Sequence, residues 1–125
     1  MPINGSLTDD NNLVFPVEVY GHSRNWKIPV NAILDTGFTG FLDLPLEFCL
    51  KAGLVLATTT TYVLANGQSV PVLLCYGTVV IDKNEIVGLV SINMSSRTTL
   101  LGVDFLKKLG MKFEADPKAR IVRFV

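Results

Sequence analysis

Charge is scarce in this sequence, and neither sign of charge dominates. Charged side chains make up 18% of the 125 residues, and eleven acidic residues balance eleven basic ones. A chain without net charge lacks the positive field that attracts nucleic acids and anionic membranes, so we expect neither as a partner. Hydrophobic residues account for 49% of the chain. A chain with so many apolar and so few charged residues is expected to expose an apolar surface patch, which predicts self-association.

Cysteine and histidine are also rare. Cys49 and Cys75 are the two cysteines, and they lie far apart in apolar segments, which favours free core thiols over a disulfide and indicates a reducing compartment. The single histidine, His22, lies in a predicted turn and is interpreted as a surface residue. This set cannot supply the ligands of a zinc site, and we expect no metal or other cofactor. It also excludes a Ser-His-Asp or Cys-His arrangement, because Gly21-His22-Ser23 lacks the context of a nucleophile elbow.

Long hydrophobic runs are missing as well. No apolar segment approaches the about 20 residues needed to cross a bilayer. Residues 1–5 have neither the basic start nor the apolar centre of a signal peptide. We therefore expect a cytoplasmic protein without a membrane partner. The length fits one domain over residues 1–125.

What the sequence does contain is a strand-rich pattern. Apolar, β-branched stretches between turn formers predict strands over Ile3–Thr8, Leu13–Tyr20, Trp26–Leu34, Phe41–Leu44, Thr58–Leu64, Val70–Tyr76, Thr78–Ile81, Ile86–Ile92, Thr98–Leu101 and Ala119–Phe124. The first two of these read as a hairpin, and Asn66-Gly67 is the strongest signal for a second one.

Two short helices complete the predicted domain. One begins with Pro45 at its first position, continues over Leu46–Ala52 and ends at Gly53. The other spans Val103–Leu109 and ends at Gly110. The pattern as a whole predicts a mainly β, closed β-barrel-like domain with two short helices.

The most informative stretch is Asp35-Thr36-Gly37, which follows the apolar run Ile28–Leu34. Burying a charge is costly, so an aspartate at the end of a buried strand is either hydrogen-bonded for structure or used in chemistry. One interpretation is a structural turn whose carboxylate accepts backbone N–H groups. The other is a catalytic carboxylate, and the tripeptide alone leaves both open.

Three stretches in the right order resemble the aspartic proteases of the retroviral type. Leu34-Asp35-Thr36-Gly37 resembles their catalytic turn, and Leu64-Ala65-Asn66-Gly67-Gln68 resembles the tip of their flap hairpin. The apolar strand and helix that follow later are matched by Leu100–Leu106. Order and spacing agree from about Val14 to Phe124, and the chain is most similar to the small stand-alone bacterial or archaeal members.

The resemblance implies an acid-protease (retropepsin) fold with one lobe per chain and no cofactor. It also implies a set of site residues, which are the catalytic Asp35, Thr36 and Gly37; the flap and groove residues Phe38, Leu64, Ala65, Asn66 and Gly67; and the supporting residues Leu101, Gly102 and Asp104. Apolar neighbours of the cleft, such as Val63, Val70 and Val72, argue for hydrophobic side chains in the substrate.

The implied function is that of a homodimeric aspartic endopeptidase acting on peptides or proteins. Such enzymes activate a water between two carboxylates that share one proton. This chain has a single Asp-Thr-Gly, and neither Asp43 nor Asp104 is followed by a hydroxyl-glycine pair. The second carboxylate must then be Asp35 of an identical chain, which a two-fold dimer supplies. Ile121–Val125 and Met1–Ile3 are candidate dimer contacts.

Two residues depart from the pattern of the family. Phe38 follows the Asp-Thr-Gly where alanine or serine is common, and Val103 stands where the viral enzymes often carry an ion-pairing arginine. Phe38 favours an alternative function, a catalytically inactive retropepsin-like module for dimerisation or peptide binding. A plain structural β domain with a fortuitous Asp-Thr-Gly is the third interpretation.

Overall fold

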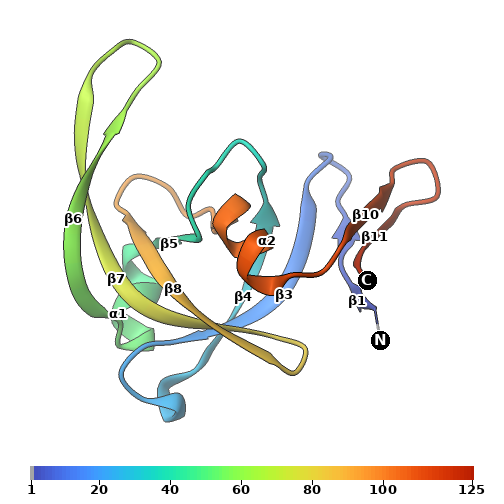
Figure 1. Cartoon of the computed structure of the whole chain (residues 1–125), viewed down its shortest axis with the longest axis horizontal. Coiled ribbons are helices and arrows are strands. Elements are labelled where there is room, and N and C mark those ends of the chain that lie inside the picture. The colour runs from blue at the N-terminus through green and yellow to red at the C-terminus, as the bar shows by residue number, and fades with distance from the viewer. Residues whose placement is uncertain (1) are drawn as a thin grey trace.

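The computed structural model describes residues 2–125, and it shows a β-rich body from which one long hairpin extends (Figure 1). Its strands are β1 (Ile3–Asn4), β2 (Ser6–Leu7), β3 (Leu13–Tyr20), β4 (Ile28–Leu34), β5 (Leu42–Pro45), β6 (Val55–Val63), β7 (Ser69–Ile81), β8 (Asn84–Asn93), β9 (Leu100–Leu101), β10 (Phe113–Asp116) and β11 (Ile121–Phe124). The helices are the 3-10 turn η1 (Arg24–Trp26), α1 (Leu46–Ala52) and α2 (Val103–Leu109). The mainly β fold with two short α-helices is confirmed. No helix within residues 2–125 is long and apolar enough to cross a membrane.

The larger sheet curls around the core. Its strand order is β2-β3-β4-β9-β5-β8-β7-β6, and β3 pairs with β7 as well as with β4. The core is built around four fully or almost fully buried rings, Phe15, Phe41, Phe105 and Phe124. Phe105 of α2 lies 5.8 Å from Phe41 and 6.4 Å from Phe124 between ring centroids, and Phe124 stacks on Phe15 at 4.4 Å. These contacts join the sheet, α2 and the last strand into one core.

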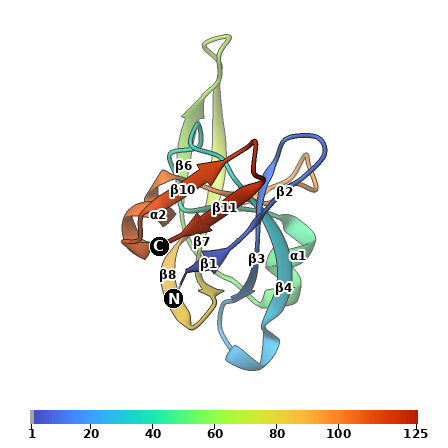
Figure 2. The same ribbon diagram turned by 90° about the vertical axis from the view of Figure 1, so that its right-hand side faces the viewer.

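A smaller sheet brings the two ends of the chain together (Figure 2). Its order is β1-β11-β10, and Ile3 pairs with Phe124. The segment Ile121–Val125, a candidate dimer contact, therefore forms a central strand with neighbours of its own chain on both sides. Among residues 2–125, the edge strands of this sheet are β1 and β10. Met1, also named as a candidate, lies outside the described residues.

Several strand boundaries differ from the prediction near the ends of the chain. The predicted strand Ile3–Thr8 is divided at Gly5, and only β2 pairs with β3 while β1 pairs with β11. The predicted strand Ala119–Phe124 begins at Ile121, because Arg120 adopts a positive φ of 57° in a turn. Strand β10 was not predicted, since Phe-Glu-Ala-Asp offers a single large apolar residue and alternates over only four positions.

Other differences lie inside the larger sheet. The strand predicted to start at Trp26 starts at Ile28, after η1. The strand predicted to start at Thr58 starts earlier, at Val55. Of the strand predicted over Thr98–Leu101, only the two residues of β9 are present. The two strands predicted on either side of Gly77 are the single strand β7. Gly77 marks close packing there, because an added Cβ would lie 2.8 Å from a methyl group of Val90.

The helix predictions are confirmed except at the start of α1. Helices α1 and α2 cover the predicted residues, and Gly53 (φ 64°) and Gly110 (φ 70°) end them in the left-handed conformation. Pro45 is the exception, because it is the last residue of β5 and precedes the helix instead of starting it.

The turn after β4 is held against the start of α2 by backbone hydrogen bonds. Strands β4 and β9 are parallel, and the N–H of Asp35 donates to the Leu101 carbonyl at 2.9 Å. Farther along, Val103 N–H donates to Phe38 O at 2.9 Å, and Gly102 N–H donates to Phe41 O at 3.1 Å. Because these hydrogen bonds join backbone groups, they need no particular side chains. They do require the backbone of the turn and the backbone at the start of α2 to lie within hydrogen-bond distance.

Gly102 makes that approach possible. It is buried, and a Cβ added to it would collide with the carbonyl oxygen of Gly40 and lie 2.6 Å from both the ring and the carbonyl oxygen of Phe38. Two of these three atoms are backbone, which cannot move aside as a flexible side chain can. Glycine is therefore the residue that this crossing requires.

Replacing Gly102 by alanine tests this constraint. We expect Gly102→Ala to lower the free energy of unfolding by about 1–3 kcal/mol or more, because the extra methyl overpacks a site with no free space. Urea unfolding followed by the fluorescence of Trp26 measures the difference. An unchanged unfolding midpoint would contradict the account of the crossing.

The two cysteines are buried free thiols, as predicted. The Cys49 thiol donates to the Leu44 carbonyl at 3.4 Å. Burial raises the pKa of Cys49 from 9.0 to about 12, helped by the nearby charges of Cys75 and Asp43. Burial also raises the pKa of Cys75. Both groups are therefore stable in the folded protein as neutral thiols.

The raised pKa values predict a loss of stability in alkali. Because the folded pKa of Cys49 lies above its ordinary value of 9.0, its stabilising effect is complete below that pH and is lost as pH rises toward 12. We expect the free energy of unfolding to fall more between pH 8 and pH 10.5, values chosen to span about that ordinary pKa, in the wild type than in Cys49→Ala. Denaturant unfolding at the two pH values measures this, and equal losses in both proteins would refute it.

Candidate active site

Asp35 lies at the carboxyl end of β4 with its side chain half-buried, while Thr36 and Gly37 are exposed. Its Oδ1 accepts a hydrogen bond from Gly37 N–H at 2.9 Å, and its carbonyl accepts one from Phe38 N–H at 3.1 Å. Within residues 2–125, no hydrogen bond reaches the other carboxylate oxygen. The hydrogen bond from Gly37 fits a structural turn, in which the carboxylate caps a backbone N–H. The oxygen without a partner fits a catalytic role, because it can contact a water or a substrate.

The other two aspartates considered from the sequence have partners of their own. Asp43 accepts from Ser91 Oγ at 2.6 Å through Oδ1 and from Asn93 Nδ2 at 2.9 Å through Oδ2, which ties β5 to β8. Asp104 forms an ion pair with Lys108, 3.5 Å away on the same helix. Asp43 in particular has both of its oxygens engaged, so it is a structural carboxylate.

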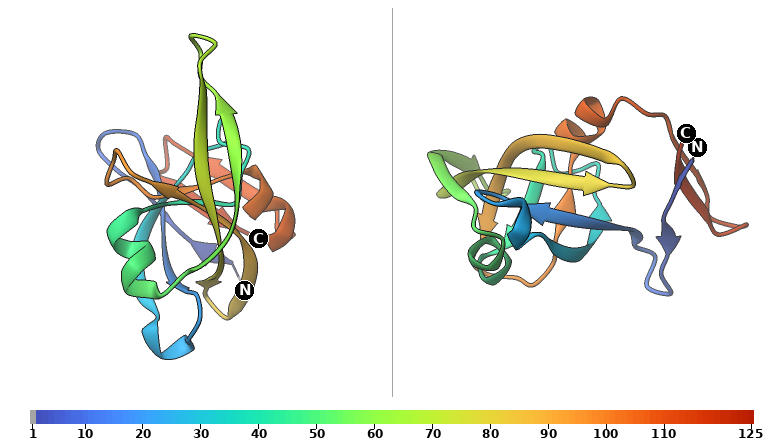
Figure 3. Two further views of the ribbon diagram at one scale, coloured as in Figure 1. Left: turned by 90° about the vertical axis from the view of Figure 1, so that its left-hand side faces the viewer. Right: turned by 90° about the horizontal axis from the view of Figure 1, so that it is seen from below.

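The hairpin of β6 and β7 projects from the body in the manner of a flap (Figure 3). The turn predicted at Asn66-Gly67 is present, as a three-residue loop with Gly67 at φ 84°. Gly67 N–H donates to the Leu64 carbonyl at 2.9 Å, and Asn66 Oδ1 accepts from Gln68 N–H at 2.9 Å. The tip therefore has a defined shape although it is exposed to solvent.

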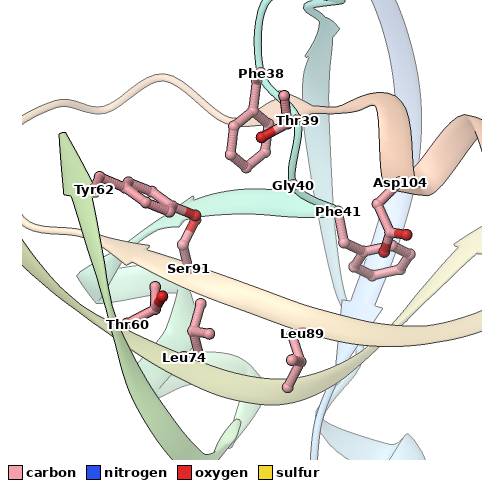
Figure 4. A pocket seen from close by; sticks show the side chains of 10 residues that line it. All are labelled: Phe38, Thr39, Gly40, Phe41, Thr60, Tyr62, Leu74, Leu89, Ser91 and Asp104. Carbon is pink, nitrogen blue, oxygen red and sulfur yellow. The ribbon is translucent and has the colours of Figure 1, made fainter. Parts of the chain in front are cut away.

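Three cavities lie between this hairpin and the Asp35 turn. The first, shown in Figure 4, has a volume of about 310 Å³ and is lined by Phe38, Thr39, Gly40, Phe41, Thr60, Tyr62, Leu74, Leu89, Ser91 and Asp104. The second, of about 450 Å³, has the apolar residues Val70, Val72, Ile92 and Met94 in its lining. The third, of about 420 Å³, is lined by Gly37–Thr39 and Thr61–Leu64.

Four of the residues predicted for the site line these cavities, whereas Asp35 and Thr36 line none of the three. Gly37, Phe38 and Leu64 line the third cavity, and Asp104 lines the first. Leu101 and Gly102 are buried behind the Asp35 turn. The residues that extend away are those of the hairpin tip, which are Ala65, Asn66 and Gly67.

Sequence reasoning missed Tyr62, which lines all three cavities. A signal for it existed, because residues two apart on a strand share a face and Tyr62 is two residues before Leu64. Sequence reasoning also missed Ser91, whose position depends on the pairing of β5 with β8. For metals, residues 2–125 contain no group of three histidine, cysteine, aspartate or glutamate side chains that could hold an ion.

Comparison with known proteins supports the fold. No protein-family model matches the sequence, and no curated protein matches it. Among solved structures, the chain is similar to the EIAV protease in complex with the inhibitor HBY-793, with a TM-score of 0.61 and 20% identity. The match covers 86% of this chain and 97% of the viral one. The predicted retropepsin-like fold is confirmed by this likeness, whereas a bacterial or archaeal origin stays a prediction.

Proposed function

We propose that the protein is a homodimeric aspartic endopeptidase in which Asp35 of each chain activates one water for the hydrolysis of a peptide bond. The observation that carries the proposal is the carboxylate of Asp35, held through one oxygen by Gly37 N–H at 2.9 Å with the other oxygen free. It lies two residues before Gly37, which lines one of the cavities next to the flap, in a chain whose fold is similar to that of the EIAV protease.

The chemistry requires two carboxylates close together. Two such groups cannot both ionise, so they share one proton. The ionised group takes a proton from the attacking water, while the protonated group donates to the carbonyl oxygen of the substrate. The same groups then return a proton to the departing amine. A single Asp35 cannot be acid and base in one step, so one chain is an incomplete site.

The second carboxylate comes from a second copy of the chain. Asp43 is ruled out as the partner within the chain because both of its oxygens are hydrogen-bonded to side chains. On a two-fold axis, a residue next to the axis meets its own copy. The loop after β4 and the flap project toward the same side of the body, which leaves that side open to a second copy (Figures 1 and 2).

The substrate is an extended peptide segment that lies between the flap and the Asp35 turn. Peptides that bind in this way add a strand to an existing sheet, and alternate side chains occupy pockets. The three cavities next to Phe38 would take those side chains. The reaction uses no metal and no organic cofactor.

A peptide-binding module without activity is the second candidate function. The observation in its favour is the bulky Phe38, which lines every one of the three cavities and so occupies part of the groove. In this case the groove would bind a peptide strand and the Asp35 turn would be structural.

Cleavage of an unstructured protein separates the two functions. We expect the wild type to cleave a denatured protein between about pH 3 and pH 7, where carboxyl groups change charge. Asp35→Asn should lower the rate by about a thousandfold or more, because it removes both reacting groups of the dimer. Pepstatin should inhibit the wild type. Gel electrophoresis and mass spectrometry of the products measure the cleavage.

Asp82→Asn is the matched control, because Asp82 is an exposed carboxylate in the turn between β7 and β8 and lines none of the three cavities. It should leave the rate unchanged. Equal rates in the wild type and Asp35→Asn would rule out the proposed mechanism. Binding of peptides without cleavage at any pH in this range would favour the inactive module.

A further inference from the structure

We infer that Phe38 and Tyr62 form an aromatic constriction that selects substrates with a small residue, glycine, alanine or serine, beside the cleaved bond. The inference rests on the proposed protease function and names the class of substrate. It concerns residues on two separate elements, the loop after β4 and the flap strand β6.

The constriction is evident from the linings of the cavities. Phe38 and Tyr62 are the two residues that line all three, whose volumes are about 310, 450 and 420 Å³. In Figure 4, the Phe38 ring points down from the loop after β4, and the Tyr62 ring points in from β6. The rings therefore divide one groove into three compartments, and a peptide passing from one compartment to another must pass between them.

Phe38 is a rigid half of this pair. Its N–H donates to Asp35 O at 3.1 Å, and its carbonyl accepts from Val103 N–H at 2.9 Å. Its ring lies against Gly40 and Gly102. A Cβ added to either glycine would lie 2.6 Å from the Phe38 ring. The ring cannot leave the groove without losing this packing.

Tyr62 is the adaptable half. It lies on β6 opposite Val70 of β7, in the part of the hairpin that extends from the body, and 37% of its surface is exposed. Movement of the flap would carry the Tyr62 ring toward or away from Phe38. The groove is thus flanked by one ring on the turn and one ring on the flap.

The sequence distance between Phe38 and Asp35 indicates which residue of the substrate lies next to the Phe38 ring. Phe38 lies three residues after Asp35, in the same hydrogen-bonded turn, so its ring is next to a substrate residue within two positions of the cleaved bond. A large side chain there would overlap the ring. A small one would let the peptide backbone pass between the two rings.

Neighbouring substrate positions face different surroundings. Side chains on one face of an extended peptide are about 7 Å apart, so the residue two positions along projects into the next compartment. The 450 Å³ cavity there has Val70, Val72, Ile92 and Met94 in its lining. The preferred substrate is therefore an unstructured segment in which a small residue at the bond lies close to a bulky apolar one.

The test uses pairs of peptides that differ only by alanine or leucine at one position within two of the cleaved bond. We expect the wild type to cleave the alanine peptide at least about tenfold faster at one such position, because a few methylene groups give this much discrimination. In Phe38→Ala and in Tyr62→Ala, which widen the constriction, the ratio should approach one. Relative kcat/KM for each pair, measured in mixtures, gives the result.

Two further variants separate selectivity from folding. Tyr76→Ala removes a more exposed aromatic ring of β7 (57% exposed) that lines none of the three cavities, and it should keep the wild-type ratio. Phe38→Leu keeps an apolar side chain against Gly40 and Gly102, and it should relax the preference in part. Thermal unfolding of each variant shows that it is folded.

The outcomes distinguish this inference from the proposed function. Cleavage with the same alanine-to-leucine ratio in the wild type, Phe38→Ala and Tyr62→Ala would overturn the constriction and leave the protease intact. If nothing is cleaved, fluorescence anisotropy measures binding of the same peptides. Binding that prefers alanine only when both rings are present supports the constriction but rejects the protease, and no binding at all rejects both.

Discussion

The close crossing of the Asp35 turn over Gly102 is the constraint on which the site depends. A buried glycine lets the loop of residues 35–41 lie directly on the start of α2, where four backbone N–H groups and their carbonyl partners fix it. The direction of the Asp35 carboxylate and the place of the Phe38 ring both follow from this crossing. A side chain at position 102 would disturb the two together.

The same crossing explains how the turn is fixed without an arginine. The viral enzymes often carry an ion-pairing arginine where this chain has Val103. Here the backbone N–H of Val103 donates to the Phe38 carbonyl, and its neighbour Asp104 donates in the same way to the Gly40 carbonyl at 3.1 Å. Exposed ion pairs contribute little to stability, so backbone hydrogen bonds in a closely packed crossing can hold the turn without one. The two chains can thus share a fold although only 20% of their aligned residues are identical.

Local signals in the sequence were sufficient for part of the structure. The two α-helices, the hairpin at Asn66-Gly67 and the turn after Leu34 each depend on glycines, proline or apolar runs within a few residues. Strand β10 and the pairing of Ile3 with Phe124 depend on residues far apart in the chain, and no short pattern marks them. The sequence indicated Asp35 and Phe38 through the Asp-Thr-Gly turn, whereas Tyr62 lines the cavities because β6 and β7 bring it opposite Phe38, and only its spacing from Leu64 hinted at this.

The central claim is that each chain supplies half of the catalytic site, and subunit mixing tests it directly. Wild-type protein is allowed to exchange subunits with a growing excess of Asp35→Asn protein, and cleavage per wild-type chain is measured. In an equal mixture about a quarter of randomly formed two-fold dimers have two wild-type chains, so activity per wild-type chain should fall to about half. Activity per wild-type chain that stays constant at every ratio, with exchange verified by mass spectrometry, would contradict the account.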